Sequence, residues 1–255
     1  MTLDAAGNVY VTGSGPNGVA VIVKYDNAGN LIWSHQYSGG DGNQPYAITT
    51  DPFGNVFVLN LVSNPGGPNF GRILKYPSTG SQFPVATTDT SYGAGSLTTD
   101  GDGNVYLVQF DSISKYNNGL SQVLWTRNIG FDSIATATDS SGSVYVAGYE
   151  YILDDVGAHT DDIIVRKYSR AGRFRWQTRF STDQLERAFS ILVESPDNFY
   201  VGGTQGSNHD RFRLLRYGTS DTQQCPAGQE LVDGVCRDPG LCPEGQTRNP
   251  NTGIC

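Results

Sequence analysis

The chain has 255 residues, 37% of them hydrophobic and 16% charged, and a formal net charge of −8. Its 17 Lys and Arg residues are spread along an acidic chain, so we expect no nucleic-acid partner. No window approaches the roughly 18 apolar residues of a membrane span, so we expect no membrane insertion either. The 32 Gly and 14 Tyr residues favour short strands joined by many turns.

An eight-residue phrase recurs from the first residues onward. Asp4–Val11 has an Asp, a Gly-Asn pair, and then Val and Tyr in alternation. Further copies occupy 51–58, 102–107 and 139–146, and a weaker one occupies 195–201. A short apolar run ending in an acid precedes each copy from the second on. Gly-Asn supplies the positive φ of a tight hairpin, and the alternation is a strand signal, so each copy predicts two antiparallel strands.

A second phrase follows each copy of the first. Lys24-Tyr25 leads to a Gly and then to Trp33, and this order returns at 115–125 and 166–176. In the second copy Phe83 stands near the Trp position, and nothing aromatic follows Tyr217 in the fifth. Each unit therefore predicts four short strands over about 40–55 residues, as in a propeller blade. We expect the Trp and Tyr side chains of these strands to pack between blades.

These phrases predict an all-β fold, a β-propeller of five recognisable four-stranded blades over residues 1–218. The last blade is incomplete, because its Trp strand is missing, and residues 219–235 are the local candidate to complete it. The sequence leaves open whether the five units close a ring or belong to a larger one.

The longest insertion between the second and third strands of a unit falls in the fourth copy. It carries several side chains with oxygen or nitrogen donors, which are Asp154, Asp155, His159, Asp161 and Asp162. Such a set can hold Ca²⁺ or another divalent ion. A solvated acidic loop is the alternative that we favour, and no other cofactor is expected.

Residues 219–255 form a second region, a cysteine-rich tail. Cys225–Cys236 and Cys242–Cys255 both follow the pattern Cys-Pro-x-Gly…Cys. Four cysteines allow three pairings, and the duplication favours the two local ones. Metal binding is the rival, but the tail has neither a Cys-x-x-Cys pair nor a His. We expect disulfides, and hence a secreted or cell-surface protein.

The two phrases resemble those of the bacterial seven-bladed β-propeller repeat (SBBP) family over about residues 2–217. They are similar, more distantly, to quinoprotein-like (PQQ-type) and NHL-type propeller repeats. The resemblance implies a secreted or surface-attached bacterial protein without assigned chemistry. The family name implies seven blades, of which five are visible here.

No catalytic pattern stands out from the repeat. The chain has no Gly-x-Ser-x-Gly elbow, no phosphate-binding Gly-rich loop, and three His residues at dissimilar repeat positions. We therefore expect a non-enzymatic extracellular module for adhesion, protein–protein interaction or assembly, with a fibre or filament subunit as one form. Its partner would be a protein or glycan at a cell surface, or a second copy of itself. The alternatives are a carbohydrate-binding propeller and a quinoprotein-like or other propeller enzyme.

Overall fold

The structure is a computed structural model that describes residues 1–40, 42–153, 159–182, 184–206, 211–218, 230–232 and 235–237. Blade 1 consists of β1 (Thr2–Leu3), β2 (Val9–Ser14), β3 (Ala20–Tyr25) and β4 (Leu31–Tyr37). Blade 2 consists of β5 (Gly42–Thr50), β6 (Val56–Ser63), β7 (Phe70–Tyr76) and β8 (Ala86–Thr90). Blade 3 consists of β9 (Gly95–Thr99), β10 (Val105–Gln109), β11 (Ser112–Tyr116) and β12 (Val123–Asn128).

Blade 4 consists of β13 (Asp132–Thr138), β14 (Val144–Leu153), β15 (His159–Tyr168) and β16 (Phe174–Phe180). Blade 5 has three strands among the described residues, β17 (Glu186–Ser195), β18 (Asn198–Gln205) and β19 (Arg211–Tyr217). In the tail, β20 (Glu230–Val232) pairs with β21 (Val235–Arg237) in a separate two-stranded sheet. The predicted all-β fold of five repeated antiparallel units is therefore confirmed. Most of residues 219–235 lie outside the described residues, so the incompleteness of the fifth unit, and its completion by that segment, stay predictions.

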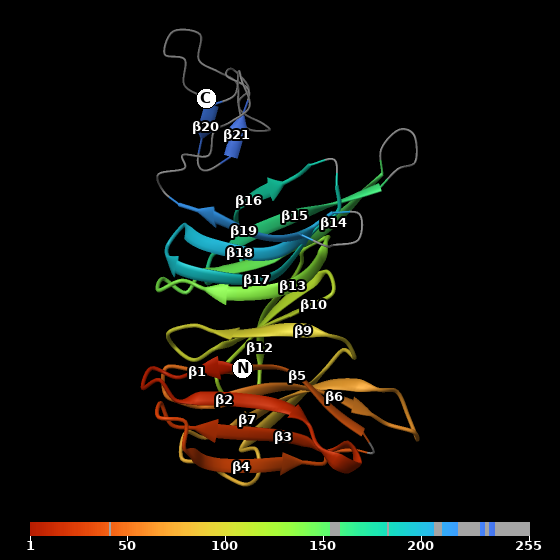
Figure 1. The fold of residues 1–255 in the computed structure, drawn as a ribbon, viewed down its shortest axis with the longest axis vertical. Helices are drawn as coiled ribbons and strands as arrows, with labels where there is room; N and C mark the ends of the chain where they lie inside the picture. Colours follow the sequence, from red (N-terminus) through yellow and green to blue (C-terminus); the bar gives the residue numbers. More distant parts are fainter. Residues whose placement is uncertain are drawn as a thin grey trace.

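The blades follow one another in chain order. Blade 1 lies at the bottom of Figure 1 and blade 5 toward the top, with the innermost strands near the middle. Each innermost strand packs on the next, β1 on β5, β5 on β9, β9 on β13 and β13 on β17. Threonine hydroxyls join these strands, since Thr99 Oγ1 donates to the carbonyl of Thr50 at 2.8 Å and Thr138 Oγ1 to that of Thr99 at 2.7 Å. This arrangement is that of a propeller.

The Gly-Asn hairpins form one edge of the molecule, which we call the turn edge. Glycines at 7, 54, 103 and 142 have φ between 76° and 79°, the left-handed region that favours glycine. In blade 5 this position is Asp197, with φ 63°. The Asp at the start of each turn caps it: Asp100 Oδ1 accepts from the backbone N–H groups of Asp102 and Asn104 at 3.1 and 3.0 Å. The predicted turns are confirmed.

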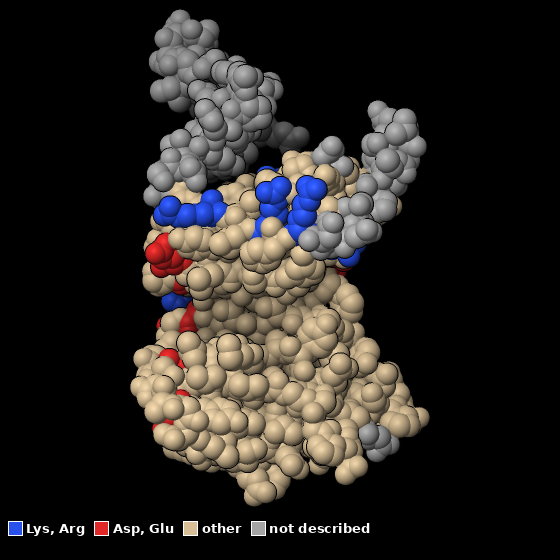
Figure 2. Space-filling model, viewed as in Figure 1, with Lys and Arg blue, Asp and Glu red and all other residues tan. Residues whose placement is uncertain are grey.

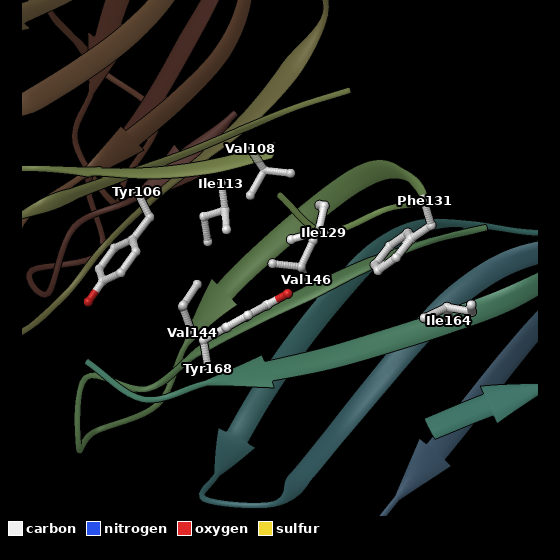
Figure 3. Close-up of a cluster of buried hydrophobic side chains, with 9 residues drawn as sticks. All are labelled: Tyr106, Val108, Ile113, Ile129, Phe131, Val144, Val146, Ile164 and Tyr168. Atoms are coloured by element: carbon white, nitrogen blue, oxygen red, sulfur yellow. The ribbon is translucent and has the colours of Figure 1, made fainter. Parts of the chain in front are cut away.

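The core consists of layers between neighbouring blades. Figure 3 shows one layer, in which Tyr106, Val108 and Ile113 of blade 3 meet Val144 and Val146 of blade 4. Three further clusters join blades 1 and 2, 2 and 3, and 4 and 5. Strands such as β10 are buried along their whole length, because both faces of the sheet are covered. Among the described residues, no such cluster joins blade 5 to blade 1.

The tryptophans pack between blades, as predicted. The Trp125 ring meets Tyr106 edge-on at 5.8 Å, and its Nε1 donates to the Arg170 carbonyl of blade 4 at 3.2 Å. Trp33 and Trp176 meet the Tyr at the same position of their own blades in the same way. These rings are part of the scaffold.

Two predictions depend largely on residues outside those described. Cys225, Cys242 and Cys255 lie there, as does the side chain of Cys236, so the disulfides and the boundary at 218 stay predictions. Within the described part of the chain, no helix is long and apolar enough to span a membrane.

Candidate functional site

An Asp, a Tyr and a Lys meet at the turn edge of most blades. In blade 3, Lys115 Nζ lies 2.8 Å from Asp100 Oδ2 and 4.9 Å from the centroid of the Tyr106 ring, and the Tyr106 hydroxyl donates to Asp100 at 3.2 Å. Blade 4 repeats this with Asp139, Tyr145 and Lys167, and blade 1 with Asp4, Tyr10 and Lys24. Blade 2 has Phe57 in place of the Tyr, and its Lys75 binds Asn118 of blade 3.

The electrostatics of these groups indicate a structural role. Burial raises the pKa of Asp100, but hydrogen bonds from Lys115 and Asn104 lower it by more, so that pKa lies below its ordinary value. Burial raises the pKa of Tyr145 to about 12. The carboxylates therefore stay ionised and paired near neutral pH, and the tyrosines stay protonated. Residues held in this way join the blades and are not free to bind a ligand.

The structure does not bring the acidic residues of the fourth insertion together as a metal site. Asp154 and Asp155 lie outside the described residues, as does the side chain of His159. Asp161 and Asp162 belong to β15, which pairs with β14 as far as Leu153, so their prediction as loop residues is wrong. Both are buried, and each meets an arginine: Asp161 pairs with Arg187 at 2.6 Å and Asp162 with Arg179 at 3.1 Å.

These arginines explain why the two acids extend the hairpin instead of lying in solvent. Asp161 points toward blade 5, where Arg187 lies on β17, and Asp162 points to the other face of β15. Among the described residues, no group of three His, Cys, Asp or Glu side chains is placed to hold a metal ion. Calcium binding by the insertion stays a prediction for the remaining residues.

A hollow of about 380 Å³ opens between blades 3 and 4, and we call it the acidic hollow. It lies at the edge opposite the turn edge, on the right in Figure 1. We call this the loop edge, and it carries the connections from β10 to β11 and from β14 to β15. One carboxylate comes from the β10–β11 turn, one from the start of β13 and one from β14. The aromatic rings come from the residue before β13 and from β14. The lining residues include Asp111, Asp132, Glu150, Phe131, Tyr149 and Tyr151.

The residues that line the acidic hollow include three carboxylates and no Lys or Arg. Asp111 accepts a hydrogen bond from Asn128 at 3.0 Å, and Glu150 is paired with Arg179 at the rim. The Arg187 guanidinium lies 4.5 Å from the centroid of the Tyr149 ring. Burial, and then the Asp132 charge, raise the pKa of Tyr149. Carboxylates beside aromatic rings are groups that bind a Lys or Arg side chain through charge-assisted hydrogen bonds and cation–π contacts.

A second hollow, of about 320 Å³, lies between blades 2 and 3. Its lining is rich in hydroxyl groups and includes Asp89, Thr90, Ser91, Ser112 and Ser114. Gln109 also lines it, but its amide is engaged, since Nε2 donates to the Gly93 carbonyl at 2.8 Å. Sequence reasoning missed both hollows. The signal that could have found them is that none of these polar residues follows the repeat.

Comparisons with known proteins show the fold class. No protein-family model matches the chain, and a search of curated proteins finds no match. A chain in a crystal structure of the mitotic checkpoint complex is similar, with a TM-score of 0.53 and 10% identity. The match covers 85% of this chain and 62% of that one, so this chain spans less than two thirds of its neighbour. The structure of Hsv2p from Kluyveromyces lactis matches with a TM-score of 0.46 and 11% identity, over 81% of this chain and 68% of that chain.

The class that the fold defines is thus the β-propeller. At such low identity the likeness extends to the fold alone. Membership of the seven-bladed repeat family stays a prediction.

Proposed function

We propose that the protein is a non-enzymatic extracellular propeller module for adhesion or surface assembly, and that its acidic hollow binds a basic segment of a partner protein. One observation carries the proposal: three carboxylates and three aromatic rings that do not belong to the repeat line this hollow, whereas the repeated Asp, Lys and Trp residues are engaged within and between blades. The extracellular location rests on the cysteine pattern of the tail.

The chemistry of the hollow favours a cationic group. Asp111, Asp132 and Glu150 contribute three carboxylates to the lining. Of the guanidinium groups nearby, that of Arg179 pairs with Glu150, and those of Arg187 and Arg166 lie against the Tyr149 and Phe131 rings. Tyr151, which is 56% exposed, also lines the hollow. A Lys or Arg side chain that enters beside Asp132 would gain a carboxylate contact in an aromatic surrounding. Because the hollow is open, this attraction depends on ionic strength.

Binding of a basic peptide tests the proposal. A pentalysine peptide should bind the wild-type protein, more weakly as salt is raised, and the double variant Asp132→Asn/Glu150→Gln should bind at least about tenfold more weakly. Fluorescence anisotropy of a labelled peptide measures both. The matched control is Asp26→Asn, which removes a carboxylate at the turn edge of blade 1. The proposal fails if both variants lose affinity equally or if neither does.

A carbohydrate ligand is the second candidate, favoured by the hydroxyl-lined hollow between blades 2 and 3. Serine and threonine hydroxyls together with a carboxylate are suited to the hydroxyl groups of a sugar. A glycan array distinguishes the two candidates. The decisive result would be a neutral glycan whose binding does not depend on salt and is lost in the double variant Ser112→Ala/Asp89→Asn. In that case the ligand would be the glycan and not the basic peptide.

A further inference from the structure

Among the described residues, the two end blades each leave one sheet face uncovered. In blade 5 this face carries Leu192, Phe212 and Leu214, whose exposed fractions are 66%, 75% and 62%. Tyr200 and Arg216 lie on the same face, directly opposite each other in the β18–β19 ladder. The other face of blade 5 packs on blade 4 through residues such as Phe199 and Val201. Large exposed apolar side chains grouped on one sheet face indicate a contact surface.

The same positions are core in the preceding blade. Leu214 is the counterpart of Val165 in blade 4, because Leu214 pairs with Gly202 as Val165 pairs with Ala147. Val165 is fully buried against blade 5. Phe212 likewise stands where blade 4 has the buried Ile163. Blade 5 therefore presents the type of face that every other blade turns toward its successor. We call this a forward face.

Blade 1 leaves a face of the opposite type uncovered. Tyr10 and Ile22 point toward blade 2, so Val9, Val11, Val23 and Tyr25 lie on the far side of the sheet. Their counterparts in blade 2 are fully buried against blade 1, and these are Val56, Val58, Leu74 and Tyr76. Val11 is 37% exposed. This is a backward face, the type that receives the forward face of a preceding blade.

We propose that the forward face of blade 5 binds the backward face of blade 1 in a second copy of the chain. Each of the four internal junctions joins one forward face to one backward face, and the described chain leaves one of each type at its two ends. The two uncovered faces are therefore complementary to each other, and neither is complementary to itself. Such a head-to-tail contact is heterologous and leaves a free face at both ends of the pair, so it extends with concentration.

The charge distribution supports this pairing. Residues 1–165 hold 5 Lys or Arg against 15 Asp or Glu, a net charge of −10, whereas residues 166–217 hold 10 against 5, a net charge of +5. Six of these ten basic residues belong to β15 and β16 of blade 4 or to the turn between them, and four belong to blade 5. Figure 2 shows Lys and Arg side chains over the upper blades. Of the four in blade 5, Arg216 lies on the forward face, where it can meet a carboxylate of another copy.

One polar contact can be assigned from the internal junctions. Lys75 Nζ donates to the Asn118 carbonyl of blade 3 at 3.0 Å, and Lys115 Nζ donates to the Arg170 carbonyl of blade 4 at 3.3 Å. Arg216 holds this Lys position in blade 5, since it pairs with Tyr200 as Lys115 pairs with Tyr106. The residue of blade 1 that corresponds to Asn118 is Asn27. The proposed contact therefore places Arg216 at the Asn27 carbonyl of the second copy, next to the half-buried Asp26.

Single-face variants test the inference, which goes beyond the proposed function and does not depend on it. The wild-type mass in sedimentation or light scattering should grow with concentration. Leu214→Glu and Val11→Glu, each with one face blocked, should be monomeric alone. Mixed in equal amounts they should give a single species of twice the monomer mass, since each variant supplies the face that the other lacks. Leu124→Glu on β12, 43% exposed and away from both end faces, should behave like the wild type.

Several results would overturn the inference. Each variant must first show the wild-type circular dichroism and a cooperative melt, so that a folding defect is recognised. A wild type that stays monomeric at all concentrations contradicts the inference, whether its end faces are then covered by residues 219–255 or stay open. A Val11→Glu variant that dimerises by itself would show that forward faces pair with each other. A monomeric mixture of the two variants would exclude the head-to-tail contact.

Discussion

Asp100→Ala is expected to lower the free energy of unfolding by about 3–5 kcal/mol, because it leaves Lys115 buried without its counter-ion. The exposed fractions of the Lys115 and Asp100 side chains are 4% and 0%, and their charged atoms lie 2.8 Å apart. The change also removes the acceptor for the Tyr106 hydroxyl and for the turn N–H groups. Denaturant unfolding followed by tryptophan fluorescence measures the loss.

Asp26→Ala is the matched control for this change. Asp26 caps its own turn like Asp100, since its carboxylate accepts from the backbone N–H groups of Ala28 and Asn30. Its carboxylate also accepts from the Asn30 side-chain amide at 2.8 Å, but no Lys or Tyr among the described residues bonds to it. Its removal therefore deletes the turn cap without leaving a buried charge unpaired. We expect a much smaller loss of stability. Equal losses in the two variants would show that the turn cap, and not the buried ion pair, dominates at Asp100.

The same carboxylates make the fold sensitive to acid. The pKa values of Asp4, Asp100 and Asp139 lie below the ordinary value of 3.8 in the folded chain. Their contribution to stability is therefore complete above that value and is lost as the pH falls through the lower, folded pKa values. Melting temperatures should drop between about pH 5 and pH 2, and less steeply in Asp100→Ala than in the wild type. An identical slope in both proteins would exclude Asp100 as a source of the pH dependence.

The fold could be predicted from the repeat because the recurring residues are those that the backbone turns and the packing of each blade require. Gly103 needs a positive φ, and the Asp three residues before it caps the turn, so both residues mark the hairpin in the sequence. Trp125 recurs in blades 1 and 4 as Trp33 and Trp176, because each ring packs on the Tyr of its own blade at the edge of the next blade. Such constraints act within one blade or between neighbours, and they therefore appear in most copies.

The acidic hollow and the buried acids were not predictable in this way. Asp111 and Glu150 are far apart in the sequence and meet only because blade 4 packs on blade 3. Asp161 and Asp162 suggest a solvated loop until Arg187 and Arg179 are placed beside them. Leu214 stands at a position that is buried in the preceding blade, but the repeat does not indicate whether a further blade covers it. Residues whose role depends on a particular neighbour leave no periodic signal.

A glycine that recurs at one repeat position provides the second large effect. Gly148→Ala is expected to cost about 3 kcal/mol of unfolding free energy, the upper part of the range for overpacking. A Cβ at Gly148 would overlap the carbonyl oxygen of Asp132 and lie 2.9 Å from the Cα of Ser133. Both are backbone atoms of β13 beside its bulge, so the whole strand must move. Thermal and denaturant unfolding measure the loss.

Gly13 occupies the same repeat position in blade 1 and is the matched control. It follows the Val-Tyr-Val strand as Gly148 does, but β1 has only two residues and does not reach it. A Cβ at Gly13 meets nothing within 4 Å, so Gly13→Ala should change the stability by less than about 0.5 kcal/mol. Similar losses in both variants would contradict the steric explanation.

The two glycine variants also connect the fold to the proposed site. Asp132 lines the acidic hollow, and its carbonyl is the atom that a side chain at Gly148 displaces. Gly148→Ala should therefore weaken binding of the pentalysine peptide even at temperatures where the variant remains folded, whereas Gly13→Ala should bind like the wild type. Unchanged affinity in folded Gly148→Ala would mean that the position of Asp132 does not determine peptide binding, and the site would then have to be sought elsewhere on the loop edge.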